Sequence, residues 1–191
     1  MKPQPCILMG KSIRLEPLSF DHHEQLTHAA LRPDLWRWVS SPLNTNDDVR
    51  DSGTAIPFAT IKSSTGQVIG STRFANMDLA NRRVEISWTF IAPEWQRTSV
   101  NTEAKYLMLR YAFEALGCIR VELKTDALNQ RSRSAILRLG AKEEGIFRNH
   151  MVVAGGRIRD TVYFSIIDRE WPAVEINLQA KLTKSYSRGG D

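Results

Sequence analysis

The chain has 191 residues, of which 42% are hydrophobic and 25% are charged, and its formal net charge is +5. This length suffices for one well-buried domain over residues 1–191. No apolar run approaches the ~20 residues of a membrane helix, and the first residues do not form a secretory signal, so we expect a cytoplasmic protein. Cys6 and Cys118 lie far apart and show no metal-ligand spacing, so we expect free thiols and no metal.

The first half of the chain alternates strand and helix signals. Residues 12–18 alternate apolar and charged side chains and predict a strand, and residues 19–31 have helical spacing with Ser19 or Asp21 as N-cap. Residues 55–74 predict a hairpin around a turn at 64–66. Another strand over 83–93 ends at Pro93. Alternation puts one set of its side chains on an apolar face (Val84, Ile86, Trp88 and Phe90) and another on a polar face (Glu85, Ser87 and Thr89).

The second half contains two helices and three strands. We expect a helix from Asn101 or Thr102 to a left-handed cap at Gly117, and then a strand over 118–126. Residues 128–140 predict a helix with Asn129 as N-cap and Gly140 as its end. Residues 143–167 predict two strands around a Gly-Gly turn.

This order predicts an α/β (α+β) domain with a mostly antiparallel sheet of about six to seven strands and flanking helices. We expect its core over about residues 9–174. Residues 175–191 end in a basic, polar sequence that favours a loose tail.

The turn between Pro93 and Thr102 is the first candidate site. A strand, a short basic and hydroxyl-rich turn and a helix start place unpaired backbone N–H groups at a positive helix terminus, which favours binding of an anion. Arg97 would add positive charge and Thr98, Ser99, Asn101 and Thr102 hydrogen-bonding groups. The alternative is that Asn101 and Thr102 only cap the helix and Arg97 is solvated.

Several segments together resemble one family. The turn 96–101, "TEAK", "AFEALG", "RVELKTDALNQRSRSAILRLGAKEEG", "RDTVYFSIIDREWP" and "IRLEPL" are similar to the GNAT superfamily of acetyl-CoA-dependent N-acetyltransferases, in particular its RimJ/RimL-like branch. The resemblance implies a GNAT fold and transfer of an acetyl group to a primary amine, on a protein N-terminus or a small molecule, by direct attack in a ternary complex.

The resemblance also implies which residues bind acetyl-CoA. In the family, a Gln/Arg-x-x-Gly-x-Gly/Ala turn cradles the pyrophosphate, and the backbone of the preceding strand lines the pantetheine. An Asn-x-x-Ser motif approaches the pantetheine or the substrate amide. The matching residues are Phe90, Ile91, Gln96, Arg97, Thr98, Ser99, Val100, Asn101, Thr102, Asn129 and Ser132.

The sequence departs from the family in two places. Ser99 and Asn101 replace small residues of the turn, and a positive φ at Ser99 would cost about 1–2 kcal/mol of strain. Residues 44–53 are too few for the helix that normally walls the acceptor site. That side is then open, contracted into a loop or completed by another subunit, so we expect either a homodimer or a wide acceptor groove.

Catalysis needs a group that accepts a proton from the amine. Glu85 matches a glutamate that some family members use through water, and its alternative role is that of a solvent-facing strand carboxylate. Ile136 stands where many members have a tyrosine acid, which leaves Ser134 as a candidate proton donor. His150 is more typical of a surface or hydrogen-bonded histidine than of a base.

Two other functional classes remain open. A relative that binds acyl-CoA poorly could act as a binding or regulatory module, because two family features are altered together. Binding to nucleic acid is disfavoured, since no aromatic residues interleave with the basic ones in a recognition pattern. The sequence does not identify the amine acceptor.

Overall fold

The computed structural model describes residues 6–30 and 55–188, and its centre is one eight-stranded sheet. The strand order is β1-β2-β3-β4-β5-β6-β8-β7. The sheet and its helices confirm the predicted α/β class, with one short strand beyond the predicted number. The strands are β1 (Leu8–Met9), β2 (Ile13–Pro17), β3 (Ile56–Lys62), β4 (Val68–Asp78), β5 (Arg83–Ile91), β6 (Arg120–Asp126), β7 (Lys142–Val152) and β8 (Ile158–Ile167).

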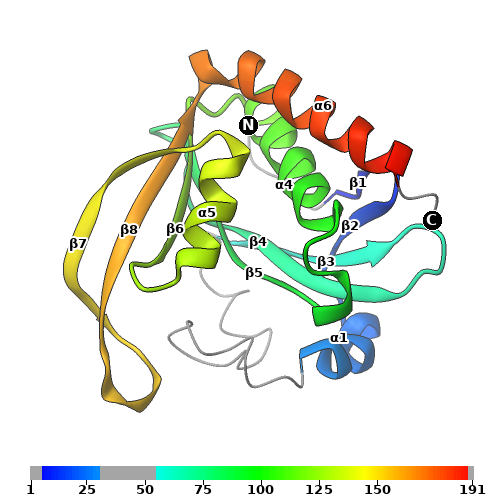
Figure 1. The fold of residues 1–191 in the computed structure, drawn as a ribbon, viewed down its shortest axis with the longest axis horizontal. Coiled ribbons are helices and arrows are strands. Elements are labelled where there is room, and N and C mark those ends of the chain that lie inside the picture. The colour runs from blue at the N-terminus through cyan, green and yellow to red at the C-terminus, as the bar shows by residue number, and fades with distance from the viewer. Residues whose placement is uncertain (1–5, 31–54, 189–191) are drawn as a thin grey trace.

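Helices cover both faces of the sheet (Figure 1). α1 (His23–Ala30) packs against β4 on one face. On the other face lie α4 (Val100–Arg110), α5 (Gln130–Leu139) and α6 (Trp171–Arg188), with α4 against α6 and α5 against β6. No helix in the described ranges is long and apolar enough to cross a membrane.

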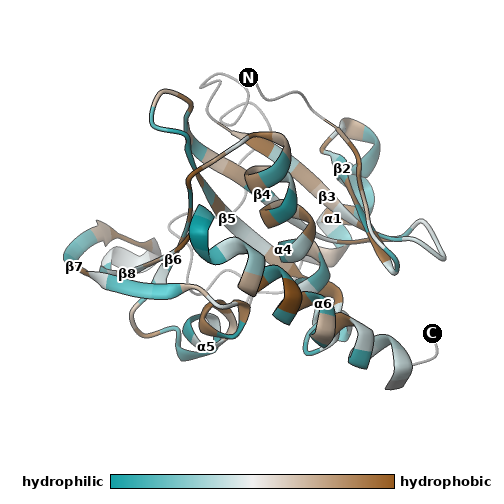
Figure 2. Ribbon diagram, turned by 90° about the horizontal axis from the view of Figure 1, so that it is seen from above, coloured by the Kyte–Doolittle hydropathy of each residue, from teal (hydrophilic) through white to brown (hydrophobic). Residues whose placement is uncertain are grey.

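The main hydrophobic core lies between the sheet and the layer of α4, α5 and α6. Its fully buried members include Phe74, Met108 and Phe164. A smaller cluster of Ala59, Ile61 and Val68 with Leu18 and Leu26 lies on the α1 side. Figure 2 shows the corresponding alternation of apolar and polar residues along α4 and α6. The larger of the two hydrophobic clusters therefore lies under these three helices.

The predicted ends of α5 are confirmed. The side chain of Asn129 accepts a hydrogen bond from the N–H of Ser132 at 3.0 Å, and Gly140 ends the helix with φ 104°. Gly117 is also left-handed, with φ 63°, and follows a π-turn over Tyr111–Ala115. Local capping chemistry was sufficient to place these ends.

Glu103 fastens the first turn of α4 to the chain between β1 and β2. Its side chain is 2% exposed and accepts hydrogen bonds from the N–H of Ser12 at 3.1 Å, the Ser12 hydroxyl and the N–H of Lys11. A Cβ at Gly10 would overlap Glu103 Oε1 and lie 2.7 Å from the backbone oxygen of Ile13, so this close approach requires glycine. Burial and the nearby Glu103 carboxylate raise the pKa of Tyr186. Glu103 is therefore a structural anchor.

The prediction of a loose tail over residues 175–191 is wrong, because α6 occupies most of that segment. The helix continues to Arg188, and Trp171, Val174, Leu178 and Leu182 are buried along one side of it. These residues repeat at intervals of three and four, which is the spacing of an amphipathic helix. The basic, polar composition hid this pattern from the sequence analysis.

Replacing Leu178 with alanine tests whether α6 is part of the core. Leu178 is fully buried, so Leu178→Ala should lower the free energy of unfolding by about 2–5 kcal/mol. Ile176→Ala is the matched control, because that side chain is 69% exposed, and it should change stability by no more than about 0.5 kcal/mol. Urea denaturation of both variants measures the difference, and equal effects would contradict the packing of α6.

Candidate functional site

β5 and β6 are the parallel pair of the described sheet, and they stay together only briefly. Arg83–Glu85 pairs with Arg120–Glu122. Beyond this point β5 continues along β4 to Ile91, while β6 continues along β8 to Asp126. The two strands therefore part toward their carboxyl ends, which is where ligands bind in open α/β sheets.

A β-bulge lies on β5 where the strands part. In the β4–β5 register, Ser71 pairs with Phe90 and Arg73 pairs with Ser87. One residue of β4, Thr72, therefore faces two residues of β5, Trp88 and Thr89. Trp88 has φ 49°, a left-handed conformation that is rare for a bulky residue.

The bulge changes which residues of β5 face α4. The Thr89 side chain contacts Lys105 of α4, although alternation placed it with Glu85 on the opposite face. Trp88 lies under the guanidinium of Arg73, with 4.5 Å between Arg73 Cζ and the ring centroid, and Phe90 shares the face of its partner Ser71. The predicted faces are therefore wrong for Trp88, Thr89 and Phe90, because the extra residue shifts the alternation by one.

The turn after β5 leads directly into the N-terminus of α4. A 3-10 turn over Pro93–Trp95 is followed by Gln96–Ser99. The first backbone hydrogen bond of the helix runs from the N–H of Glu103 to the backbone oxygen of Ser99, at 2.9 Å. The preceding N–H groups lack partners within the helix, as in any helix start. Arg97 and Thr98 are exposed there. This terminus has the polarity that an anion requires.

The backbone of this turn does not carry the predicted strain at Ser99. Ser99 has φ −70° and ψ −17°, which any residue adopts, and it occupies the N-cap position of α4. The left-handed residue of the turn is Arg97, with φ 63°. Replacement of the family's glycine by Ser99 therefore has no backbone cost in this conformation, and the strain argument is wrong.

The starts of α4 and α5 are joined by side chains across the gap between β5 and β6. Gln96 donates a hydrogen bond to Ile91 O at 2.8 Å and accepts one from Arg131. Arg131 lies in the first turn of α5, next to the capping pair of Asn129 and Ser132. The structure thus brings the predicted residues 96–102 and 129–132 to one end of the gap. Ser134 lies farther along α5 and is exposed.

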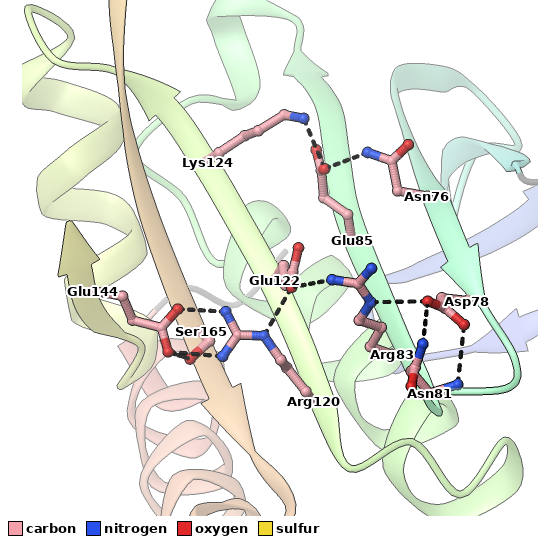
Figure 3. Close-up of polar contacts among 10 residues, drawn as sticks. All are labelled: Asn76, Asp78, Asn81, Arg83, Glu85, Arg120, Glu122, Lys124, Glu144 and Ser165. Atoms are coloured by element: carbon pink, nitrogen blue, oxygen red, sulfur yellow. Dashed lines mark hydrogen bonds and ion pairs between the residues drawn. The ribbon is translucent and has the colours of Figure 1, made fainter. Parts of the chain in front are cut away.

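Glu85 is buried rather than solvent-facing. Its side chain is 2% exposed, and its Oε2 atom is 2.9 Å from Lys124 Nζ and accepts a hydrogen bond from Asn76 Nδ2 at 2.7 Å (Figure 3). Lys124 lies on the neighbouring strand β6 and was not among the predicted site residues. The alternation of Glu122, Lys124 and Asp126 on the polar face of β6 was the signal that could have identified it.

A second row of charges crosses the same face closer to the start of β5 (Figure 3). Its centre is Arg120, whose Nε atom lies 2.8 Å from Glu122 Oε1 and whose guanidinium also forms an ion pair with Glu144. The Arg120 guanidinium lowers the pKa of Glu144 to about 2. Arg83 also belongs to this row, and its Nε atom lies 3.2 Å from Asp78 Oδ2. These ion pairs tie β4, β5, β6 and β7 together below the point where β5 and β6 part.

An open hollow of about 890 Å³ lies on the outer strands of the sheet. It is lined by Ile146, Phe147, Arg148, Asn149, His150 and Asp160. His150 is 3.0 Å from the Thr161 hydroxyl, and burial together with Lys124 and Arg159 lowers its pKa. The ring of His150 packs edge-on against Phe147. His150 is therefore a hydrogen-bonded histidine, the alternative that the sequence favoured.

A family model described as "Acetyltransferase (GNAT) domain" matches residues 12–142. The chain belongs to the GNAT acetyltransferase family. It is similar to "Putative ribosomal N-acetyltransferase YdaF" of Bacillus subtilis, with 36% identity over 106 residues that span 56% of this chain and 57% of that protein. The matched region thus covers just over half of that GNAT relative.

Solved GNAT structures agree with this assignment. A GCN5-related N-acetyltransferase from Brucella melitensis has a TM-score of 0.87 and 36% identity, over 94% of this chain and 86% of that one. Mycobacterium smegmatis RimJ in complex with CoA-disulfide has the same fold, with a TM-score of 0.78 and 21% identity over 88% of each chain. The predicted superfamily is confirmed, and the name of YdaF supports the predicted RimJ/RimL-like branch. No group of metal-ligating side chains occurs among the residues described.

The ion pair of Glu85 gives a stability prediction. Lys124→Met removes the partner of a buried carboxylate, so we expect a loss of about 3–5 kcal/mol at pH 7. Adding Glu85→Gln should recover most of this loss, since the amide is neutral and still hydrogen-bonds to Asn76. A urea-denaturation double-mutant cycle measures both effects. A double variant no more stable than Lys124→Met alone would show that the pair does not account for the loss.

Proposed function

We propose that the protein is an acetyl-CoA-dependent N-acetyltransferase that transfers the acetyl group to a primary amine by direct attack within a ternary complex. The observation that carries this proposal is the parting of β5 and β6 with the N-termini of α4 and α5 at its open end. Family membership supports the reaction type, and the RimJ structure with CoA-disulfide supports the same fold as a scaffold for coenzyme A.

The residues at the open end fit acetyl-CoA. The backbone N–H groups at the start of α4, with exposed Arg97 and Thr98, suit the pyrophosphate. The gap between β5 and β6 would take the pantetheine along Phe90 and Ile91. Asn129 and Ser132 lie on the opposite side of that gap, at the start of α5. When bound, acetyl-CoA supplies an acetyl thioester that an amine can attack.

Glu85 is proposed as the group that receives the proton of the attacking amine, through water. An amine must be uncharged to attack, and an α-amino group has a pKa of about 8. Proton transfer to a positioned base typically contributes ~10²–10⁴ in rate. Glu85 is the carboxylate on β5 at the point where the strands part, and Lys124 and Asn76 orient it. Ser134 is a weaker candidate donor to the departing thiolate, because it is exposed on α5.

The acceptor is proposed to be the N-terminus of a protein or a small amine. The name of the relative "Putative ribosomal N-acetyltransferase YdaF" supports the first. The predictions of a homodimer or a wide groove came from residues 44–53, which lie outside the described residues, and they stay proposals. The second candidate is a catalytically impaired relative that binds acyl-CoA poorly and acts as a binding or regulatory module. The relaxed backbone of Ser99 removes one of the two arguments for it.

Charge reversal at Arg97 tests the phosphate site. Arg97→Glu places a negative charge at the helix terminus that is proposed to hold pyrophosphate, so the dissociation constant of acetyl-CoA should rise at least about tenfold. Arg169→Glu reverses an exposed arginine just after β8, at the other end of the parallel strands, and should leave binding unchanged. Isothermal titration calorimetry compares the two variants. Equal affinities would refute the assignment of the phosphate site.

A neutral substitution of Glu85 tests the proposed proton acceptor. Glu85→Gln should lower the rate of amine acetylation by about 10²-fold or more, mostly at low pH where more of the amine is protonated, with little change in acetyl-CoA affinity. Glu122→Gln is the matched control, because Glu122 pairs with Glu85 in register on the same face. A thiol-release assay over a panel of amines gives the pH profiles. Coincident profile shapes for Glu85→Gln and the parent would exclude Glu85 as the base.

A further inference from the structure

Lys105 is a buried amine that the proposed reaction does not yet use. It lies in the middle of α4 and is 6% exposed. Its Nζ atom donates hydrogen bonds to the Thr89 hydroxyl and, at 3.4 Å, to the Thr72 hydroxyl. The two hydroxyls are themselves 2.8 Å apart. Lys105 thus reaches from the helix into the sheet, where it meets one residue from β4 and one from β5.

No carboxylate pairs with Lys105 in the part of the chain that the structure describes. Charged groups on the surrounding elements contact other partners: Glu103 and Arg110 on α4, Arg14 and Glu16 on β2, Lys62 on β3, Arg73 on β4, Arg83 and Glu85 on β5, and Glu175 on α6. Burial alone lowers the pKa of Lys105, to about 7. Above neutral pH its amine is therefore mostly uncharged.

The contacts of Lys105 coincide with the β5 bulge. Thr89 directly follows Trp88, the left-handed residue of the bulge, and Thr72 is the β4 residue that faces both. The same helix begins at the proposed phosphate site, five residues before Lys105. Lys105 therefore connects the helix that would hold the pyrophosphate to the strand segment that would hold the acyl end of the same ligand.

We propose that Lys105 is a positioning residue, whose amine holds Thr89 and the bulge in the geometry that receives the acetyl thioester. This inference rests on the proposed acetyl-CoA-dependent function. An ammonium group at the same place would be a buried charge without a counter-ion, and the side chain would gain by moving toward water. Protonation of Lys105 should therefore release Thr89, while the pyrophosphate site at the start of α4 stays intact.

This mechanism predicts that acetyl-CoA and CoA bind with different affinities, and that the ratio of the two affinities depends on pH. Both ligands share the pyrophosphate site, but only acetyl-CoA presents a thioester to the bulge. In the parent protein at pH 8, acetyl-CoA should bind about fivefold more tightly than CoA, which is the effect of one ordinary hydrogen bond. Below pH 6 this preference should fall to about one. Titration of the CoA phosphates affects both ligands alike and cancels in the ratio.

Lys105→Met is the direct test, because methionine keeps the length and removes the amine. We expect its preference for acetyl-CoA to be near one at every pH from 5.5 to 9, measured by isothermal titration calorimetry. Thr89→Val should behave in the same way, since it removes the hydroxyl that Lys105 holds. Lys184→Met, on the exposed side of α6, is the control and should keep the preference of the parent and its pH dependence.

Linkage gives a second, ligand-free readout that also shows whether Lys105→Met folds. The pKa of Lys105 is about 7 in the folded protein and 10.5 in an unfolded chain. The parent therefore carries the full cost of burying the charge below pH 7, and this cost disappears as the pH rises toward 10.5. Lys105→Met should melt at a higher temperature than the parent at pH 6, and its advantage should shrink by pH 10.

The outcomes are distinguishable. A parent that prefers acetyl-CoA by the same factor at every pH, or a Lys105→Met variant that keeps the pH-dependent preference, would overturn the role of Lys105 and leave the proposed function intact. A parent that binds neither acetyl-CoA nor CoA would overturn the function and this inference together. Loss of the preference in both Lys105→Met and Thr89→Val, with CoA affinity retained, is the result that supports it.

Discussion

The constraint on which the site depends is the parting of two parallel strands. β5 and β6 share three register pairs and then follow different neighbours, β4 and β8. A sheet that parts in this way needs support on both sides of the opening. Here the support comes from ion pairs across the paired ends of the strands and from the contact at the open end between Gln96, in the turn before α4, and Arg131 of α5.

Three buried charged or titratable side chains stabilise this same region. Glu103 fixes the start of α4 to the β1–β2 segment, Glu85 joins β5 to β6 through Lys124, and Lys105 joins α4 to the bulge. Each of the three is at most 6% exposed. Burying a polar group is costly unless its partners are present, so the contacts of Glu103 and Lys105 specify one arrangement of α4 on the sheet, and those of Glu85 fix β5 against β6. They set the position of the proposed phosphate site relative to the bulge.

Sequence reasoning succeeded where the signal was local. Asn129 and Gly140 each define a helix end by their own chemistry, and both ends were predicted correctly. It failed at the faces of Trp88, Thr89 and Phe90, because a bulge depends on the register with a partner strand. It also failed for α6, where four buried residues at helical spacing were masked by basic and polar neighbours. The sequence contained that period, but composition was given more weight.

The two lysines, half-buried Lys124 and buried Lys105, were missed for a different reason. Lys124 was hidden because the strand was analysed alone, without the carboxylate that faces it from β5. Lys105 falls among Ala104, Leu107 and Met108, which are buried residues of α4, and a lysine at such a position is the sequence signal of a buried amine. Charge within an apolar helical stripe was therefore the recoverable clue. The hydrogen bonds from that amine to the hydroxyls of Thr72 and Thr89 could be identified only from the fold.

The most direct test of the account is a crystal structure of the protein with coenzyme A. The account predicts the pyrophosphate on the backbone N–H groups at the start of α4, next to Arg97. It also predicts the pantetheine between β5 and β6, with its thiol end at the bulge beside Thr89. Coenzyme A bound elsewhere, for example in the hollow beside His150 with the gap between β5 and β6 left closed by side chains, would contradict it.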